Sequence, residues 1–304
     1  MKSKLTGLIA APFTALMEDS SLNLAMIETQ ARVLAENSVN GAFICGTTGE
    51  GMSLTTTERL QVAERWTQVS PKNLRVIVHV GHNSLDESCA LAAHAEQIGA
   101  HAIATIGPSF FRPSSAEQLV NFCAQTAKAA PELPFYFYHM PAMTGVNFPM
   151  IDFLKLASQR IPNLAGIKFT HENLMDYTEC LNFENKKFNI LWGRDEILLA
   201  ALVLGATGAV GSTYNYMAPF YQKLLAAFTE GDLHSARANQ LSAIAAIQVM
   251  VRHGGLPAGK AIMKLIGIDC GPVRAPLRNL NLKETNNLLC DLRKIGFPFL
   301  KIKT

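Results

Sequence analysis

The sequence predicts a (β/α)8 barrel, an α/β fold, with a helical tail after it. Short apolar runs of five to seven residues alternate with longer stretches of helical period up to about residue 230. Runs of this length are typical of strands that are buried on both faces of a parallel sheet. Eight strand–helix repeats, joined by the right-handed crossovers that parallel strands adopt, leave a closed barrel as the expected architecture.

The strands are expected, in chain order, at Gly7–Ala11, Gly41–Cys45, Arg75–Val80, His101–Ile106, Leu133–His139, Leu164–Phe169, Phe188–Trp192 and Thr207–Gly211. Three helices between them have a capping-box pattern at their start, in which a Ser or Thr precedes a Glu by three positions. The pairs are Thr55 with Glu58, Ser84 with Glu87, and Ser114 with Glu117. Each stands ahead of an amphipathic segment, which supports the alternation.

After the eighth unit the helical period continues without another strand. The tail helices are expected at Leu233–Arg252, Pro257–Ile266 and Leu282–Ile295, separated by Gly254-Gly255 and Gly271-Pro272. Glycine and proline interrupt helices, so these pairs are natural boundaries. Since no Pro/Ser-rich linker occurs, we predict one domain over 1–304, with the barrel in 1–230 and the C-terminal helices of 231–304 packed on it.

The composition excludes several classes of protein. With 49% hydrophobic and 17% charged residues, the chain is globular and not disordered. The 27 Lys and Arg are balanced by 24 Asp and Glu and form no long run of like charges, so no nucleic acid partner is expected. No apolar run approaches the roughly 18 residues of a membrane-spanning helix, so no membrane partner is expected either.

The cysteines and the N-terminal segment predict a cytoplasmic protein. The six cysteines lie at least twenty residues apart, which excludes CxxC and zinc-finger spacings and indicates reduced thiols. The segment Leu5–Met17 follows two lysines and has the outline of a signal peptide. Because Thr6, Pro12 and Thr14 interrupt its apolar stretch, we expect a strand and a loop there instead.

A lysine inside the sixth predicted strand is the sharpest anomaly of the sequence. Reactive residues of such barrels stand at the C-terminal ends of the strands. Lys168 lies there, on the same alternating face as Gly166 and Thr170, while Ile167 and Phe169 face the helices. Desolvation would lower the pKa of its ammonium and favour attack on a carbonyl, which predicts Schiff-base chemistry. The alternative is a lysine that ends the strand and reaches into water.

Polar residues follow three other strands. Tyr136 and Tyr138 share one face of the fifth strand, where a tyrosine hydroxyl can relay protons or serve only as an ordinary strand residue. The glycine-rich turn Gly46–Gly51 contains Thr47 and Thr48 and presents backbone N–H groups suited to a carboxylate. The alternative for this turn is a tight strand–helix connection without a ligand.

The seventh and eighth strands end in carboxylates and hydroxyls, at Gly193-Arg194-Asp195-Glu196 and at Gly211–Asn215. Such groups suit hydrogen bonds to a polyol, although Asp195 and Glu196 can also cap the following helix. Two further patterns carry little weight. Gly254–Ala261 resembles a Walker A motif but ends in Ala and follows a helix, and His79 with His82 lacks the carboxylates of a metal site.

Four motifs together resemble the pyruvate-dependent class I aldolases related to dihydrodipicolinate synthase. They are Gly46–Glu50, Tyr138–Gly145, Gly166–Lys168 and Gly211–Asn215, and their order and spacing agree over nearly the whole chain. Within that family the chain is most similar to the N-acetylneuraminate lyases, through Gly205–Tyr216, Pro141–Gly145 and Lys260–Met263. The synthases carry an arginine where Met143 stands and a Tyr-Tyr pair where Phe110-Phe111 stands.

The resemblance implies reversible cleavage of N-acetylneuraminate, a sialic acid, to N-acetylmannosamine and pyruvate, without a metal or an organic cofactor. It implies that Lys168 forms the imine, that Tyr138 moves the proton, and that Thr47 and Thr48 bind the carboxylate. The further substrate-binding residues would be Thr170, Gly193, Asp195, Glu196 and Ser212. Members of the family are commonly homotetramers.

One residue departs from the lyase pattern. Arg194 stands where an aromatic or aliphatic residue is expected, and it either pairs with Asp195 or shifts the preference toward a modified or acidic sugar. Two alternatives therefore stay open. The chain either cleaves another 2-keto-3-deoxy acid with the same lysine and tyrosine, or is a non-catalytic barrel that binds sugars.

Overall fold

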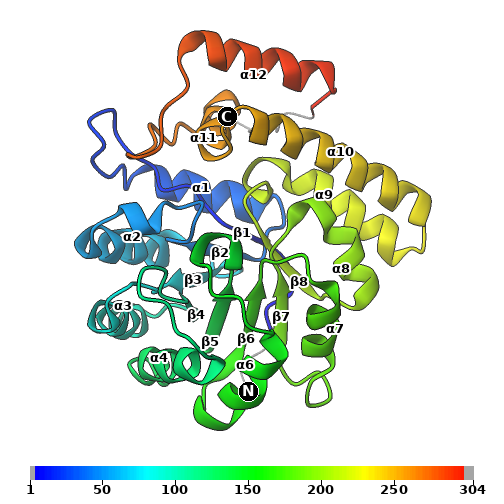
Figure 1. Cartoon of the computed structure of the whole chain (residues 1–304). Helices are drawn as coiled ribbons and strands as arrows, with labels where there is room; N and C mark the ends of the chain where they lie inside the picture. Colours follow the sequence, from blue (N-terminus) through cyan, green and yellow to red (C-terminus); the bar gives the residue numbers. More distant parts are fainter. Residues whose placement is uncertain (1–3, 298–304) are drawn as a thin grey trace.

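The computed structural model describes residues 4–297, so the predicted domain's outermost residues, 1–3 and 298–304, lie outside it. Its eight parallel strands close into a barrel in sequence order (Figure 1), which confirms the predicted fold class. The strands are β1 (Gly7–Ala10), β2 (Gly41–Ile44), β3 (Arg75–His79), β4 (Ala102–Ile106), β5 (Phe135–His139), β6 (Leu164–Phe169), β7 (Asn189–Trp192) and β8 (Gly208–Gly211). Each lies within its predicted range, and β6 has the predicted bounds.

Helices follow the strands around the barrel. They are α1 (Met26–Glu36), α2 (Thr56–Val69), α3 (Leu85–Gln97), α4 (Ala116–Lys128), α6 (Met150–Arg160), α7 (Leu174–Asn182), α8 (Leu198–Leu204) and α9 (Tyr214–Thr229). Three short helical turns lie in the loops at the C-terminal ends of strands, η1 (Gly51–Ser53), α5 (Pro141–Thr144) and η2 (Asp195–Ile197). Among the described residues, no helix is long and apolar enough to cross a membrane.

The three predicted capping boxes have different outcomes. Thr55 and Glu58 form the complete reciprocal box of α2. The Ser84 side chain accepts from the Glu87 amide at the start of α3, which is half of the box. The third prediction was wrong by one residue, because Ser115 is the N-cap of α4 and accepts from the Gln118 amide.

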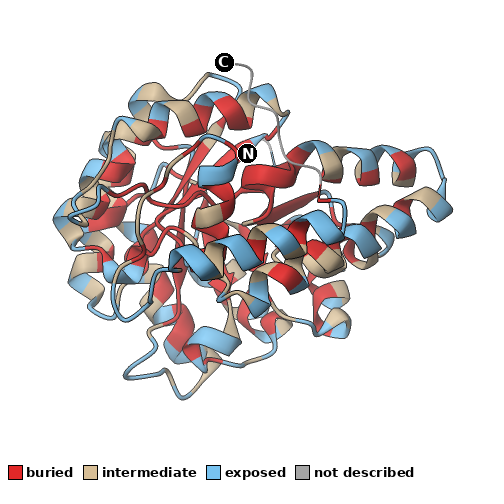
Figure 2. Cartoon of the chain, turned by 90° about the horizontal axis from the view of Figure 1, so that it is seen from above, coloured by how far each residue is buried: buried red, intermediate tan, exposed pale blue. Residues whose placement is uncertain are grey.

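The strand residues alternate between two separate packing layers. Phe135, Phe137, Ile167 and Phe169 belong to the large core between the strands and the helices. Tyr136 and Tyr138 belong to a smaller cluster inside the barrel, together with Phe43. Buried residues accordingly concentrate along the strands and on the inner faces of the helices (Figure 2). The predicted orientation of β5 and β6 is therefore confirmed.

The tail does more than extend the barrel. Its helices are α10 (Leu233–Arg252), α11 (Leu256–Leu265) and α12 (Leu282–Lys294), all close to their predicted bounds. α10 packs along α9 and against η2, and its Gln240 side chain donates to the carbonyls of Asp195 and Glu196 at 3.2 and 2.9 Å. Because it holds the loop after β7, the tail takes part in shaping the C-terminal end of the barrel.

Candidate active site

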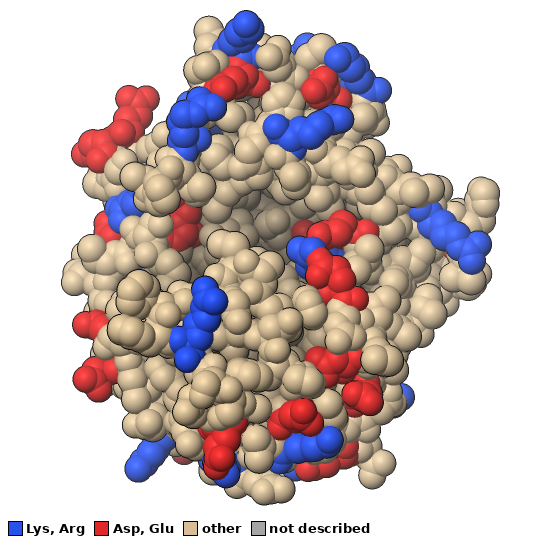
Figure 3. All heavy atoms as spheres, in the orientation of Figure 1, with Lys and Arg blue, Asp and Glu red and all other residues tan. Residues whose placement is uncertain are grey.

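A cavity of about 510 Å³ opens at the C-terminal end of the barrel. It is visible as the hollow near the centre of the molecule in Figure 3, with charged side chains of both signs around it. All nine residues that the sequence assigns to a site line this one cavity: Thr47, Thr48, Tyr138, Lys168, Thr170, Gly193, Asp195, Glu196 and Ser212. Its size is typical of pockets for small molecules.

Lys168 projects from β6 into the interior of the barrel and is only 4% exposed. Its Nζ lies 4.0 Å from the centroid of the Phe43 ring and 3.9 Å from that of Tyr138. Burial lowers the pKa of the ammonium to about 7, although the negative charge of Asp195 acts in the opposite direction. The alternative of a lysine that reaches into water is thus excluded, and a large neutral fraction exists near pH 7.

Tyr138, next to the last residue of β5, is paired in register with Lys168 of β6. Its hydroxyl lies 3.2 Å from Thr47 Oγ1, and burial raises its pKa to about 12 despite that hydrogen bond. The phenol therefore stays protonated at neutral pH. Tyr136, on the same face, lies deeper in the barrel, where its hydroxyl donates to Asn189 Oδ1 at 2.9 Å. Of the two tyrosines, only Tyr138 lines the cavity.

The glycine-rich turn after β2 is folded tightly and still presents free donors. Glu50 is left-handed with φ of 53°, and a Cβ on Gly51 would lie 1.8 Å from the carbonyl oxygen of Cys45. Within residues 4–297, the amides of Thr47 and Thr48 donate to no acceptor. We call the Thr47 and Thr48 hydroxyls and amides the carboxylate cradle. The turn is the tight strand–helix connection that the sequence offered as one alternative, and its unpaired amides are compatible with the other, so binding of a carboxylate stays a prediction.

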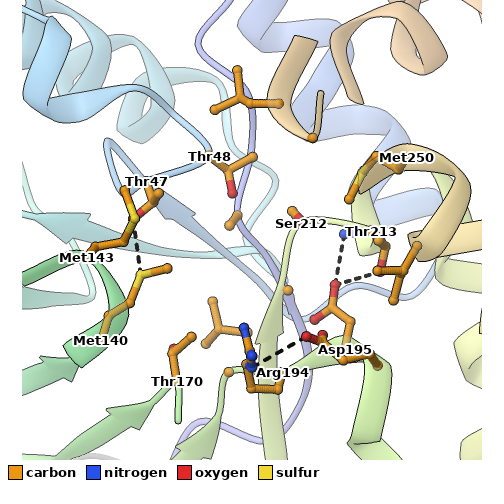
Figure 4. A pocket seen from close by; sticks show the side chains of 18 of the residues that line it. Thr47, Thr48, Met140, Met143, Thr170, Arg194, Asp195, Ser212, Thr213 and Met250 are labelled. Carbon is orange, nitrogen blue, oxygen red and sulfur yellow. Dashed lines mark hydrogen bonds and ion pairs between the residues drawn. The ribbon is translucent and has the colours of Figure 1, made fainter. Parts of the chain in front are cut away.

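Opposite the cradle, Asp195 is buried and held by Thr213 (Figure 4). Its Oδ2 accepts from the Thr213 amide at 3.0 Å and from Thr213 Oγ1 at 2.6 Å. Burial raises the pKa of the carboxyl to about 6, although these hydrogen bonds favour the ionised form. A Cβ on Gly211 would lie 1.9 Å from Asp195 Oδ1, so glycine is required there. Asp195 thus joins the loops after β7 and β8 and does not cap α8.

Of the two alternatives for Arg194, the pairing with Asp195 was wrong. The guanidinium pairs with Glu172, from the loop after β6, and its Nε lies 3.4 Å from Glu196 Oε1. Asp195 is turned the other way, toward Thr213, so Arg194 takes the more exposed carboxylates beside it. Sequence reasoning missed Glu172, because nothing in a single sequence shows that two loops meet.

Sequence reasoning also missed apolar residues at and near the cavity. Phe43 is not among the described residues that line it, but its ring lies inside the barrel 4.0 Å from Lys168 Nζ, and strand alternation along β2 could have located it. Ile247 and Met250 of α10 and Leu256 of α11 line the cavity itself. No sequence pattern locates them at the site, because the packing of the tail on the barrel brings them there.

The His79/His82 pair and the Walker-like segment Gly254–Ala261 make contacts within the fold. The His79 ring Nδ1 lies 3.0 Å from the Cys45 carbonyl oxygen, and His82 Nδ1 accepts from the Ser84 amide at 2.9 Å. In the described part of the chain, no group of three or more His, Cys, Asp or Glu side chains is arranged for a metal ion. Lys260, within the Walker-like segment, is buried in α11 and pairs with Glu50.

Comparison with known proteins places these features in a family. The model of the dihydrodipicolinate synthetase family matches residues 4–295. The chain is 42% identical to N-acetylneuraminate lyase of Rattus norvegicus, over 97% of this chain and 94% of that protein. It is 46% identical to N-acetylneuraminate lyase A of Xenopus laevis, over 96% and 97%. Among solved structures, Proteus mirabilis N-acetylneuraminate lyase superposes with a TM-score of 0.95 at 42% identity, covering 97% of this chain and all of that one.

Proposed function

The chain belongs to the dihydrodipicolinate synthetase family, in which it functions as a lyase of N-acetylneuraminate, and we propose that Lys168 and Tyr138 carry out the cleavage. The products are N-acetylmannosamine and pyruvate, and the reaction is reversible. One observation carries the assignment of the nucleophile. Lys168 is a buried amine with a pKa of about 7, and it shares its cavity with free donors for a carboxylate.

The reaction begins with the neutral amine of Lys168. It adds to the C2 ketone of the open-chain sugar acid, and loss of water leaves a protonated imine. The Thr47 and Thr48 donors hold the adjacent carboxylate, which brings the ketone to the amine. The Phe43 and Tyr138 rings pack against Nζ and keep water from these parts of its surroundings.

Cleavage then needs a proton to leave the C4 hydroxyl. Because the pKa of Tyr138 is about 12, its phenol keeps its own proton at neutral pH and transfers one only in concert with a second group. The substrate carboxylate, held beside Thr47, supplies that group. As the C3–C4 bond breaks, its electron pair moves into the imine and gives an enamine, while C4 leaves as the aldehyde of N-acetylmannosamine. Protonation at C3 and addition of water release pyruvate and restore the lysine.

The opposite wall of the cavity would hold the sugar tail. Gly193, Glu196 and Ser212 present polar groups there, and Thr170 lies between that wall and Tyr138. Asp195 would mainly hold the loop that carries Ser212 in place, because one of its carboxylate oxygens already accepts from Thr213. Arg194 is already paired with Glu172 and Glu196, so its charge gives no support for a strongly acidic sugar tail.

The proposed mechanism also bears on the cofactors, the cellular location and the oligomeric state. The proposed mechanism uses the Lys168 amine, the Tyr138 hydroxyl and the hydroxyl and amide donors of Thr47 and Thr48, and we infer that no metal or organic cofactor takes part. All six cysteines are free, which fits the cytoplasmic location expected from the sequence. A homotetramer stays a prediction from the family.

The decisive experiment is reductive trapping. The protein is incubated with N-acetylneuraminate, or with pyruvate alone, then reduced with borohydride and analysed by peptide mass spectrometry. The expected result is the same reduced pyruvate adduct on Lys168 from both incubations. An adduct from pyruvate alone would indicate an aldolase for another 2-keto-3-deoxy acid. Absence of an adduct from both would leave Lys168 a structural residue and overturn the mechanism.

A further inference from the structure

We propose that Glu50 and Lys260 form a buried positioning pair that fixes the carboxylate cradle of Thr47 and Thr48 from outside the cavity. The proposal rests on the proposed function, because it assigns the pair a role in binding the keto acid. Among the described residues that line the cavity, neither Glu50 nor Lys260 is present. The pair would therefore act through the cradle and without contact to the substrate.

The pair joins the turn after β2 to the tail. Lys260 Nζ lies 2.8 Å from Glu50 Oε1, and the two side chains are 3% and 2% exposed. Lys260 Nζ also donates to the Pro272 carbonyl at 2.6 Å, and Glu50 Oε2 accepts from the Arg274 amide at 2.8 Å. Both ends of the pair are thus anchored to residues of the tail.

The contacts pass directly from this pair to the cradle. The Glu50 amide donates to the Thr47 carbonyl at 3.1 Å, and Gly51 donates to the Gly46 carbonyl at 3.1 Å. Glu50 itself holds a left-handed backbone conformation that a non-glycine residue rarely adopts. Glu50 is therefore held twice, through its side chain by Lys260 and through its backbone by Thr47. This leaves the cradle little freedom to shift.

Stability alone does not account for a buried pair at this place. The desolvation of two charges offsets most of their attraction, and an apolar pair of similar volume is often as stable. What an apolar pair lacks is direction, because dispersion contacts cannot replace the hydrogen bonds that Lys260 Nζ donates to the Pro272 carbonyl and that Glu50 Oε2 accepts from the Arg274 amide. The ion pair and these two hydrogen bonds together hold the turn at a single position, which is the requirement for a site that must orient a small acid.

A neighbouring ion pair offers a matched control. Arg274 and Glu58 also join the tail to the segment after β2, with Arg274 Nη1 2.7 Å from Glu58 Oε2. Glu58 belongs to the start of α2, and its side-chain hydrogen bonds in the described part of the chain go to Thr55 and Arg274. Arg274 binds Glu58 through its side chain but Glu50 through its backbone amide. The Arg274 side chain also keeps the Ser53 and Ser20 carbonyls as partners. A variant at Glu58 therefore weakens the attachment of the tail while the Glu50–Lys260 pair keeps both its charges.

The test uses three variants of the pair: Lys260→Met, Glu50→Gln and the double variant that combines them. Glu58→Gln serves as the control. The measurement is the pyruvate concentration that gives half-maximal borohydride trapping on Lys168, with acetone as a carbonyl compound that lacks a carboxylate. The single variants and the double variant should all raise this concentration about tenfold or more, while trapping at saturating pyruvate and trapping of acetone change by less than about twofold. Glu58→Gln should lower the melting temperature and leave both carbonyl compounds unaffected.

The double variant covers the case in which a single variant does not fold, because removal of both charges leaves no unpaired ion in the core. Normal half-saturation in the double variant would overturn the proposal. Tighter pyruvate binding in Glu50→Gln would also overturn it, since that result is expected if the pair acts only by its charge near the bound acid. Equal losses for acetone and pyruvate would show a general structural role instead. If the unaltered protein traps neither compound, the proposed function fails and not this inference alone.

Discussion

The protein contains two lysines that are equally buried but differ in the groups that surround the ammonium. Lys168 and Lys260 are both only 4% exposed. Lys168 faces the rings of Phe43 and Tyr138, and the Asp195 carboxylate, whose charge acts on it, is hydrogen-bonded to Thr213. Lys260 instead lies against the Glu50 carboxylate at 2.8 Å.

The difference shows that burial by itself does not make a nucleophile. An ammonium that is buried against aromatic rings is desolvated without a full counter-ion, so its neutral form becomes accessible at neutral pH. An ammonium buried beside a carboxylate has an opposite charge whose attraction offsets much of the cost of burial. In the roles that we propose, the same residue type therefore supplies the nucleophile on β6 and positions a loop from α11.

The largest expected effect separates the two lysines. Lys168→Met should abolish both turnover and trapping of pyruvate, because no other lysine is present among the described residues that line the cavity. The Arg194 guanidinium stays protonated and is not a nucleophile. Lys260→Met should still trap pyruvate on Lys168 at saturating concentration. The measurement is peptide mass spectrometry after borohydride reduction. Trapping on another lysine in Lys168→Met would refute the assignment.

Removal of the Tyr138 hydroxyl should have the next largest effect. Tyr138→Phe keeps the ring beside Nζ but removes the proton carrier, so kcat should fall by roughly 10²-fold or more. Imine formation with pyruvate should persist, since the amine is intact and the cradle loses only the contact between Thr47 Oγ1 and the Tyr138 hydroxyl. Steady-state cleavage and single-turnover trapping separate these steps. An equal fall in both would mean that Tyr138 shapes the site and does not move the proton.

The pH dependence of imine formation tests the environment of Lys168. Below its pKa of about 7, the amine is protonated, so the rate at subsaturating pyruvate should fall by about tenfold per pH unit as the pH decreases. Asp195 raises the pKa of Lys168, so Asp195→Asn should move the midpoint to lower pH. The check is trapping with cyanoborohydride at a series of pH values. A midpoint that moves to higher pH would contradict the proposed cause.

The fold was predictable because the same physical pattern recurs eight times. A parallel strand buried on both faces reads as a short apolar run, and the alternation along β6 places Lys168 and Ile167 on opposite sides without further information. The exact start of a helix was less predictable. Ser114 and Ser115 both offer a capping hydroxyl, and Glu117 and Gln118 both offer a side chain three residues later, so the sequence does not distinguish the two N-caps. In the structure α4 begins after Ser115.

The candidate site was predictable where strands position its residues and less so where loops and the tail do. Lys168, Tyr138 and Thr47 follow directly from strand ends, which the barrel brings together. Glu172 reaches Arg194 through a meeting of two loops that leaves no mark in the sequence. Lys260 resembled part of a nucleotide-binding motif, and only its packing against Glu50 shows what it holds.

The smallest expected effect concerns the wall for the sugar tail, which lies across the cavity from the cradle. Ser212 presents its hydroxyl to the cavity, and a single neutral hydrogen bond contributes about 1 kcal/mol. Ser212→Ala should therefore raise the KM for N-acetylneuraminate by roughly fivefold and leave the half-saturating concentration of pyruvate unchanged. Glu196→Gln should act in the same direction, because Glu196 also faces this wall. Steady-state cleavage and pyruvate trapping measure the two quantities. Equal losses of both would place Ser212 beside the keto acid, so the two walls would not divide the substrate as proposed.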